Sequence, residues 1–262
     1  MAEITMPRLY IKSQGEDTTK LALKLTTVPH RVIVRFTGGC GLMHPEHVNN
    51  LYQMFIAAFH GFKGAIIFGG TRMLLTADPK TVKPGITEIP PLIKKANPQC
   101  QILGVIPKTQ DLRICDFGMI VSGEPDHDDF FTVNHPDIDE LLIVQQSVDI
   151  EVHWETEFEE CIKLTDALRT FANFDSLLIS YNGGGITAKE IEATAELGWP
   201  VLLIDNSGRK TEEYCRNAAF LSNHLNVHVC DNTASALRYS LIRLGMIADR
   251  HLQVVHATTR HG

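Results

Sequence analysis

Three glycine-rich turns, each following an apolar strand, are the segments of this chain best suited to hold a ligand. The turns are Gly38-Gly39 after Val32–Phe36, Gly69-Gly70 after Ala65–Phe68, and Gly183-Gly184-Gly185 after Ser176–Ser180. Glycine lets the backbone approach a ligand without a Cβ in the way, and it adopts positive φ at low cost. In an open parallel sheet, ligands bind beyond the carboxyl ends of the strands. We therefore expect the three turns to line one crevice.

The third turn opens a helix that we predict over Thr187–Leu197. The first N–H groups of a helix and its positive dipole end together favour an anion such as phosphate. Thr187 and Glu190 have the spacing T-x-x-E, which is typical of a capping box. The same spacing allows Thr187 to contact a phosphate and Glu190 to lie near a ribose. The two roles are compatible, and the sequence leaves both open.

Polar residues beside these turns are further candidates. Arg209 in Ser207-Gly208-Arg209 follows a strand, where it could pair with a phosphate or base, or lie exposed as a surface arginine. Arg72 has the same two interpretations, and Thr71 could bind phosphate or only satisfy its turn. The predicted ligand-binding residues are Gly38, Gly39, Gly69, Gly70, Thr71, Arg72, Asn182, Gly183, Gly184, Gly185, Thr187, Glu190, Ser207, Gly208 and Arg209.

Alternating strand and helix patterns must position these residues. Such alternation is typical of βαβ units. It predicts an α/β, three-layer Rossmann-like fold with a mostly parallel central sheet. Strands are expected at 32–36, 65–68, 101–106, 113–121, 141–144, 176–180, 200–204 and 226–229, and helices at 47–60, 87–96, 157–174, 187–197, 211–222 and 234–244. No repeat or linker appears, so we predict one domain over 1–262, with an N-terminal extension at 1–30 and a core at 31–250.

Composition limits the classes of partner. The 262 residues carry a formal net charge of −7 with no basic stripe, which argues against nucleic acid. No apolar run is long enough to span a membrane, and the N-terminus does not resemble a signal peptide. The six cysteines form no C-x-x-C pair, so we expect reduced thiols and a cytoplasmic protein. We predict no metal site, because 44–47 resembles a helix start and 124–129 a solvated acidic loop, and no cofactor beyond the ligand.

Four segments together resemble the SLOG superfamily, named for Smf/DprA-like and LOG proteins. They are Gly38-Gly39, Gly69-Gly70, Gly104-Val105-Ile106-Pro107 and Gly183-Gly184-Gly185-Ile186-Thr187-Ala188-Lys189-Glu190. The last is similar to the LOG pattern P-G-G-x-G-T-x-x-E. The sequel from Gly198 to Arg209 is more similar to SLOG domains at the N-terminus of melastatin-type TRP channels and to their free-standing bacterial relatives. The resemblance spans roughly Val32 to Tyr214.

The resemblance implies a domain that binds nucleotides or nucleotide-derived signals such as ADP-ribose relatives. For LOG enzymes it also implies cleavage of the N-glycosidic bond of a nucleoside monophosphate, with Glu190 as the catalytic residue. Two features depart from that enzyme pattern. Asn182 and Ile186 replace its proline and second fixed glycine, and His153–Glu157 lacks its Arg-Lys pair, so a source of electrostatic stabilisation is missing.

We therefore expect a ligand-binding sensor module, with a nucleotide N-glycosidic hydrolase as the alternative. A dinucleotide-dependent oxidoreductase is disfavoured because no G-x-G-x-x-G follows the first strand. A homodimer is the expected assembly, because crevices of this kind often use a neighbouring subunit.

Overall fold

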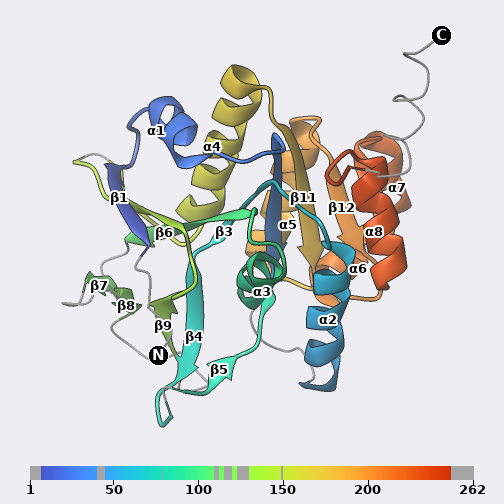
Figure 1. The fold of residues 1–262 in the computed structure, drawn as a ribbon, viewed down its shortest axis with the longest axis horizontal. Coiled ribbons are helices and arrows are strands. Elements are labelled where there is room, and N and C mark those ends of the chain that lie inside the picture. The colour runs from blue at the N-terminus through green and yellow to red at the C-terminus, as the bar shows by residue number, and fades with distance from the viewer. Residues whose placement is uncertain are drawn as a thin grey trace, which may run out of the picture.

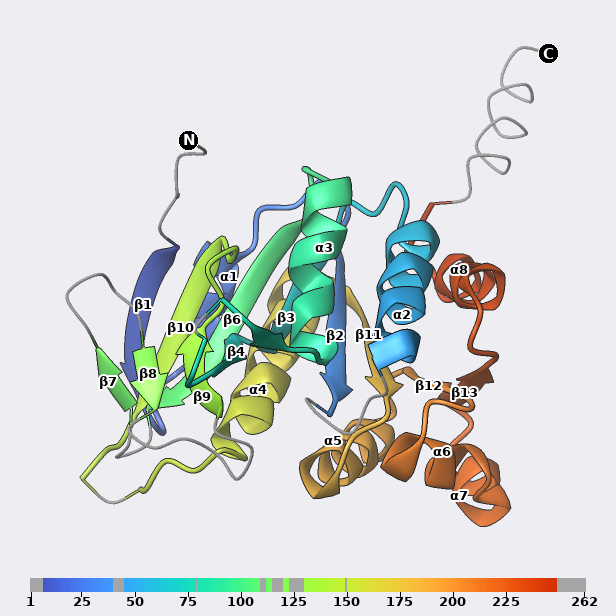
Figure 2. The same ribbon diagram turned by 90° about the horizontal axis from the view of Figure 1, so that it is seen from below.

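A central β-sheet with helices on both faces forms the body of the molecule, as the computed structural model shows (Figures 1 and 2). The structure describes residues 7–39, 45–78, 80–108, 112–114, 120–122, 130–148 and 150–248. The predicted three-layer α/β fold is confirmed. Within these residues, no helix combines the length and apolar character that a membrane crossing needs.

The central sheet has eight strands, all paired in parallel, in the order β1-β10-β6-β3-β2-β11-β12-β13. The strands are β1 (Arg8–Ser13), β2 (Val32–Gly38), β3 (Ala65–Gly69), β6 (Gln101–Lys108), β10 (Glu140–Gln145), β11 (Asp175–Tyr181), β12 (Val201–Ile204) and β13 (Val227–Cys230). Strands covered on both faces need apolar side chains throughout. The inner strands accordingly read as almost unbroken apolar runs, which is why the sequence predicted them.

The helices divide between the two faces of this sheet (Figure 2). One face is covered by α2 (Pro45–Ala58), α3 (Ile89–Ala96) and α8 (Ala234–Arg243). The other is covered by α1 (Thr19–Leu25), α4 (Thr156–Ala172), α5 (Gly185–Glu196), α6 (Arg209–Cys215) and α7 (Ala218–Asn223). Strand β2 alternates between them: Val34 and Phe36 pack toward α2, whereas Ile33 packs toward α4. Arg35 therefore points to the face of α4 and α5.

A smaller antiparallel sheet lies beside the first, with the order β5-β4-β9-β8-β7. Its strands are β4 (Thr71–Leu75), β5 (Val82–Lys83), β7 (Leu112–Ile114), β8 (Ile120–Ser122) and β9 (Phe130–Asn134). The chain passes from β3 into β4 at Gly70, whose amide donates to the carbonyl of Val105 at 3.1 Å. The prediction of one strand over 113–121 is wrong, because β7 and β8 are two strands that pair with each other.

Strand β1 forms one edge of the central sheet, although the sequence analysis placed its residues in an extension outside the core. Its outer residues Leu9 and Ile11 are about half exposed, so it lacks the apolar run of a buried strand. Lys12 faces inward, where its Nζ lies 2.6 Å from Oε1 of the fully buried Glu160 on α4. Thr18 donates a hydrogen bond to the same oxygen. A buried ion pair thus attaches β1 to the body.

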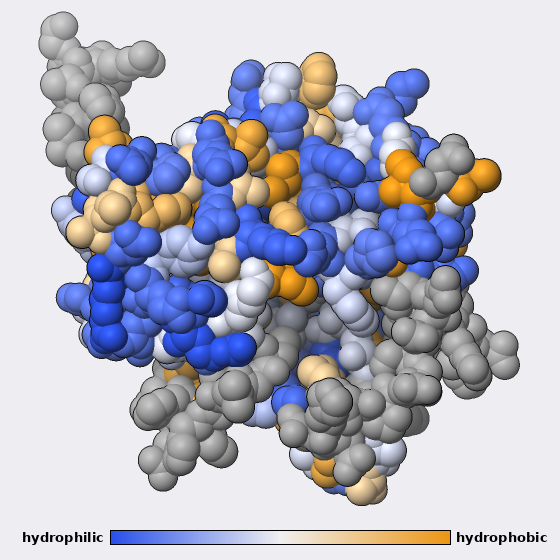
Figure 3. All heavy atoms as spheres, turned by 180° about the vertical axis from the view of Figure 1, so that it is seen from behind, coloured by the Kyte–Doolittle hydropathy of each residue, from blue (hydrophilic) through white to orange (hydrophobic). Residues whose placement is uncertain are grey.

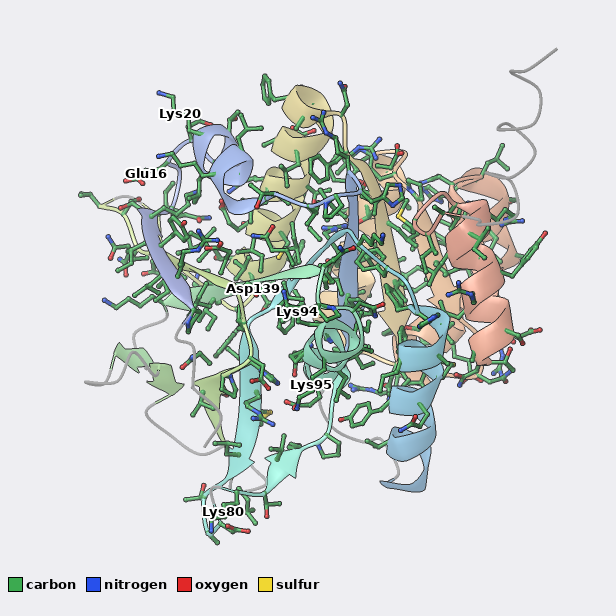
Figure 4. The ribbon with its side chains drawn as sticks, in the orientation of Figure 1. Glu16, Lys20, Lys80, Lys94, Lys95 and Asp139 are labelled. Carbon is green, nitrogen blue, oxygen red and sulfur yellow. The ribbon has the colours of Figure 1, made fainter. Side chains whose placement is uncertain are left out.

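An ion pair joins helix α3 to the residue that precedes β10. Lys94 on α3 and Asp139, just before β10, point toward one another in Figure 4, with Nζ and Oδ2 3.1 Å apart.

The prediction of a single helix over 211–222 is wrong. The segment is divided into α6 and α7, and the side chain of Asn217 caps α7 by accepting a hydrogen bond from the backbone N–H of Phe220. Viewed from behind, the described surface is mainly hydrophilic with scattered apolar residues (Figure 3), as expected of a folded domain in water.

Candidate ligand-binding site

The strand order reverses between β2 and β11, which are neighbours at the centre of the sheet. After β2 the chain continues to β3 on one side, and after β11 it continues to β12 on the other. The register places Gly38 opposite Tyr181, so both strands end at the same level. Such a switch point leaves a crevice at the carboxyl edge of a parallel sheet. The turns at 38–39 and 183–185 therefore face each other across it.

A cavity of about 220 Å³ opens at this edge. Its walls come from the end of β2, the β3–β4 junction, the 3₁₀ helix η1 (Ile86–Glu88), the start of α4 and the first turns of α5. Five predicted residues line it: Gly38, Gly69, Thr71, Thr187 and Glu190. Apolar side chains supply much of the remaining wall, namely Phe36, Ile86, Trp154, Phe158 and Ile186.

Glu190 lies on the cavity wall, and two side chains of β2 bind its carboxylate. Its Oε1 is 3.5 Å from Nη1 of Arg35, and both side chains are almost fully buried. The hydroxyl of Thr37 donates a hydrogen bond to the same carboxylate. Arg35 also donates to the hydroxyl of Thr194, one turn further along α5. Burial raises the pKa of Glu190 above its ordinary value despite the opposing effects of Arg35 and Thr37.

Glu157, in the first turn of α4, supplies a second carboxyl group to the same cavity. It lies against the backbone of Gly69, so close that a Cβ built on that glycine would be 2.3 Å from Oε1. Desolvation, followed by the nearby charge of Glu190, raises the pKa of Glu157 to about 8. The carboxyl is thus mainly protonated at neutral pH. A glycine at position 69 is what makes room for it.

The start of α5 differs from the sequence-based expectation. The helix begins at Gly185 rather than Thr187, its N-cap is Gly184, and no side chain caps it. Thr187 is the third helical residue and Glu190 the sixth, so the predicted capping box is wrong. A side chain at Gly183 is excluded, because φ is +89° and a Cβ would lie 2.3 Å from Oγ1 of Thr187. No capping side chain therefore competes with a ligand for the first N–H groups of α5.

Arg209 extends across the two central glycine turns. A Cβ on Gly39 would be 3.2 Å from its Nη1, and a Cβ on Gly184 would be 3.1 Å from its Nη2. Its backbone has φ of +51°, and the preceding Gly208 has φ of +90°. The sharp turn after β12 thus directs a guanidinium toward the uncapped start of α5. The cation and the helix N-terminus together form a positive region beside the cavity.

Other predicted residues have structural contacts instead. The backbone N–H of Asn182 donates to the hydroxyl of Ser207 at 3.1 Å, and this hydrogen bond joins the turns after β11 and β12. Gly70 packs against the Cα of Gly104, away from the cavity lining. Arg72 is engaged by Glu88 through two hydrogen bonds, from Nε at 3.2 Å and Nη2 at 2.8 Å. His135 also lies on Glu88, with Nε2 3.3 Å from Oε2. Gly185 starts the helix, with no heavy atom near its Cβ position.

Sequence reasoning missed Arg35 and Glu157 as site residues. Arg35 could have been noticed as the one charged residue within an apolar strand, because a buried charge needs a partner. Glu157 gave no signal beyond its place at a helix start. Trp154, which precedes α4, lines the cavity and is 41% exposed.

Within the residues that the structure describes, no group of three or more His, Cys, Asp or Glu side chains is placed to hold a metal ion. Residue 44 and the acidic loop at 124–129, discussed above, lie outside the described residues.

The site thus belongs to a three-layer α/β protein with a crevice at its topological switch point. No protein-family model and no curated protein matches the chain. Among solved structures, it is similar to the molybdenum cofactor carrier protein MCP from Chlamydomonas reinhardtii. That match has 14% identity and a TM-score of 0.46, covering 82% of this chain and 98% of the other. The molybdenum cofactor binding protein from Rippkaea orientalis gives 16% and 0.45, covering 82% and 97%.

Proposed function

We propose that the chain binds a nucleotide or nucleotide-derived ligand, such as a nucleoside monophosphate or an ADP-ribose relative, and acts as a sensor module. The observation that carries this proposal is the position of Arg209, whose guanidinium lies over Gly39 and Gly184 beside the uncapped start of α5. Helix N–H groups and an adjacent arginine are a common combination for binding phosphate.

The cavity next to this region suits the remainder of such a ligand. Trp154 and Ile186, which are 41% and 43% exposed, offer an apolar surface on which a base could stack. The carboxylate of Glu190 could accept hydrogen bonds from ribose hydroxyls. Phosphate, sugar and base would then contact three distinct sets of residues.

Calorimetric titration with AMP and with adenosine tests the phosphate contact directly. Arg209→Ala should weaken AMP binding by about tenfold or more, because a hydrogen bond to a charged group contributes roughly 1.5–3 kcal/mol. Adenosine, which lacks the phosphate, should bind the variant and the parent protein equally. Arg216→Ala is the matched control, since this arginine at the end of α6 is exposed and pairs with Glu212. Equal losses for AMP and adenosine would show that Arg209 does not contact phosphate.

The identity of the ligand is tested by extending the titrations to ADP, ADP-ribose, NAD and cyclic ADP-ribose. Gly184→Asp, which places a negative charge at the start of α5, should abolish the binding of any of them. If none of the six compounds binds, the nucleotide proposal is wrong for these ligands. Trp154 offers a second readout: it lies at the cavity while the other tryptophan, Trp199, is buried. Its fluorescence should change on saturation.

A nucleotide N-glycosidic hydrolase is the second candidate function. The observation that favours it is the buried carboxylate of Glu190 on the cavity wall, since carboxylates stabilise oxocarbenium-like sugars in glycoside hydrolysis. Chromatography of each titration mixture distinguishes the two candidates. A sensor leaves the nucleotide intact, whereas the hydrolase releases free base in proportion to the amount of protein.

A further inference from the structure

Two carboxyl groups from different helices line one cavity, yet their surroundings differ. Glu190 of α5 has a guanidinium and a hydroxyl beneath it, from Arg35 and Thr37. For Glu157 of α4, the described part of the chain provides no ion pair, and its carboxyl lies against the backbone of Gly69. Such an arrangement favours the ionised form of one acid relative to the other.

The other charged and titratable groups around Glu157 do not change this balance. Cys161, one turn further along α4, is buried and its pKa is raised, so it remains a neutral thiol. Glu160 on the same helix faces β1, where it pairs with Lys12. Lys189 of α5 is held by Glu155 at 2.7 Å. Glu190 is the one neighbour whose charge acts on the pKa of Glu157, and it raises that pKa.

We propose that Glu157 is a second catalytic residue, the proton donor to the leaving base in N-glycosidic cleavage of a bound nucleotide, while Glu190 stabilises the positive charge on the ribose. This inference rests on the proposed nucleotide binding and takes up the second candidate function, the hydrolase, for the same site. Pairs of carboxyl groups whose environments separate their protonation states divide acid and stabilising roles in this way.

The step balances with water as the one co-reactant. The bond between C1′ and the base nitrogen breaks, and its electron pair stays on that nitrogen, which takes the proton of Glu157. A water oxygen then bonds to C1′ and gives a proton to the Glu157 carboxylate, restoring the acid. The products are the free base and the ribose phosphate with a hydroxyl at C1′. After the base has taken the proton and before water restores it, Glu157 is a carboxylate. Because Glu157 is in the first turn of α4, the positive end of that helix stabilises this carboxylate.

Glu157→Gln is the test, because glutamine keeps the shape and a hydrogen-bond donor but cannot supply a proton. With AMP as the probe, we expect affinity within about threefold of the parent protein and adenine release reduced at least 100-fold. Glu159→Gln is the matched control, since this neighbour on α4 is exposed, and it should leave both quantities unchanged. Release by the parent protein should fall above about pH 8, as Glu157 loses its proton.

The outcomes separate this inference from the function on which it rests. If AMP and the other nucleotides bind but no base is released, the inference is wrong and the binding function stands. Absence of binding overturns both for these ligands. Release by Glu157→Gln at the parent rate, with Glu190→Gln inactive, would remove Glu157 from the reaction. If Glu157→Gln does not fold, Glu157→Asp and the pH profile decide: a profile flat through pH 9 overturns the proposal.

Discussion

The raised pKa of Glu157 makes the stability of the protein depend on pH in a direction opposite to that of an ordinary surface carboxylate. Its ordinary pKa is about 4.5 and its value in the folded chain is about 8. Between these values the folded state holds a proton that the unfolded chain has released. The contribution to stability is therefore fully present below about pH 4.5 and is lost as the pH rises through about 8.

The magnitude follows from this interval. Each pH unit corresponds to about 1.4 kcal/mol. When the pH is raised from 5.5 to 7.5, the titration of Glu157 therefore lowers the free energy of unfolding of the parent protein by up to roughly 3 kcal/mol. Glu157→Gln is neutral at every pH and lacks this contribution. Its free energy of unfolding, relative to the parent protein, should rise by the same amount across that range.

Urea unfolding at pH 5.5, 6.5 and 7.5 measures this difference, with Glu159→Gln as the exposed control. The pKa of Glu190 is also raised, so Glu190 makes the free energy of unfolding fall with pH in the parent protein and in Glu157→Gln alike. The difference between the two proteins therefore isolates the contribution of Glu157. Parallel pH profiles for Glu157→Gln and the parent protein would refute the reasoning. They would mean that Glu157 is solvated well enough to ionise normally.

Three further predictions concern the residues around the cavity. Gly183→Ala should lower the free energy of unfolding by roughly 3 kcal/mol in urea titrations, because positive φ and overlap with a side chain both oppose it. Gly198→Ala also has positive φ but open space, so it should cost about 1 kcal/mol; equal losses would contradict the overlap argument. Arg35→Met should cost about 3–5 kcal/mol at pH 8 and less as the pH is lowered, because the carboxylate left without its arginine can then take up a proton; a penalty independent of pH in the same titrations would show that the lost charge is not the cause. Gly69→Ala should displace the carboxyl of Glu157 and lower its pKa, as followed by carboxyl NMR, and an unchanged titration would count against the contact.

The centre of the fold was predictable because its signals are local. Strands β2 and β3 are mainly apolar runs that end in glycine, and β11 is one that is followed closely by glycines, so each signal lies within a short segment. Their shared position at one edge follows from the rule for parallel sheets. That is why the turns of the candidate site could be identified before the structure.

The parts that escaped prediction depend on contacts between distant residues. The spacing of Thr187 and Glu190 is locally consistent with a capping box, but the helix starts two residues earlier and Glu190 turns to Arg35. Helix α4 and strand β11 separate Glu157 from the glycine loop at 183–185 along the chain, and Gly69 lies far earlier. Only the order of strands in the sheet brings Glu157 against Gly69. Pairings of this kind are set by tertiary packing, which a local pattern does not contain.

The edge position of β1 also constrains how the chain is made. Its partner β10 begins 132 residues later, since Arg8 pairs with Glu140. At typical synthesis rates the first strand waits on the order of ten seconds before its partner leaves the ribosome. During that time Lys12 is solvated, and the half-apolar strand has no sheet to join. A fragment beginning at residue 31 would lack β1 altogether, leaving β10 as an exposed edge open to aggregation and Glu160 without its shorter ion pair, the one to Lys12.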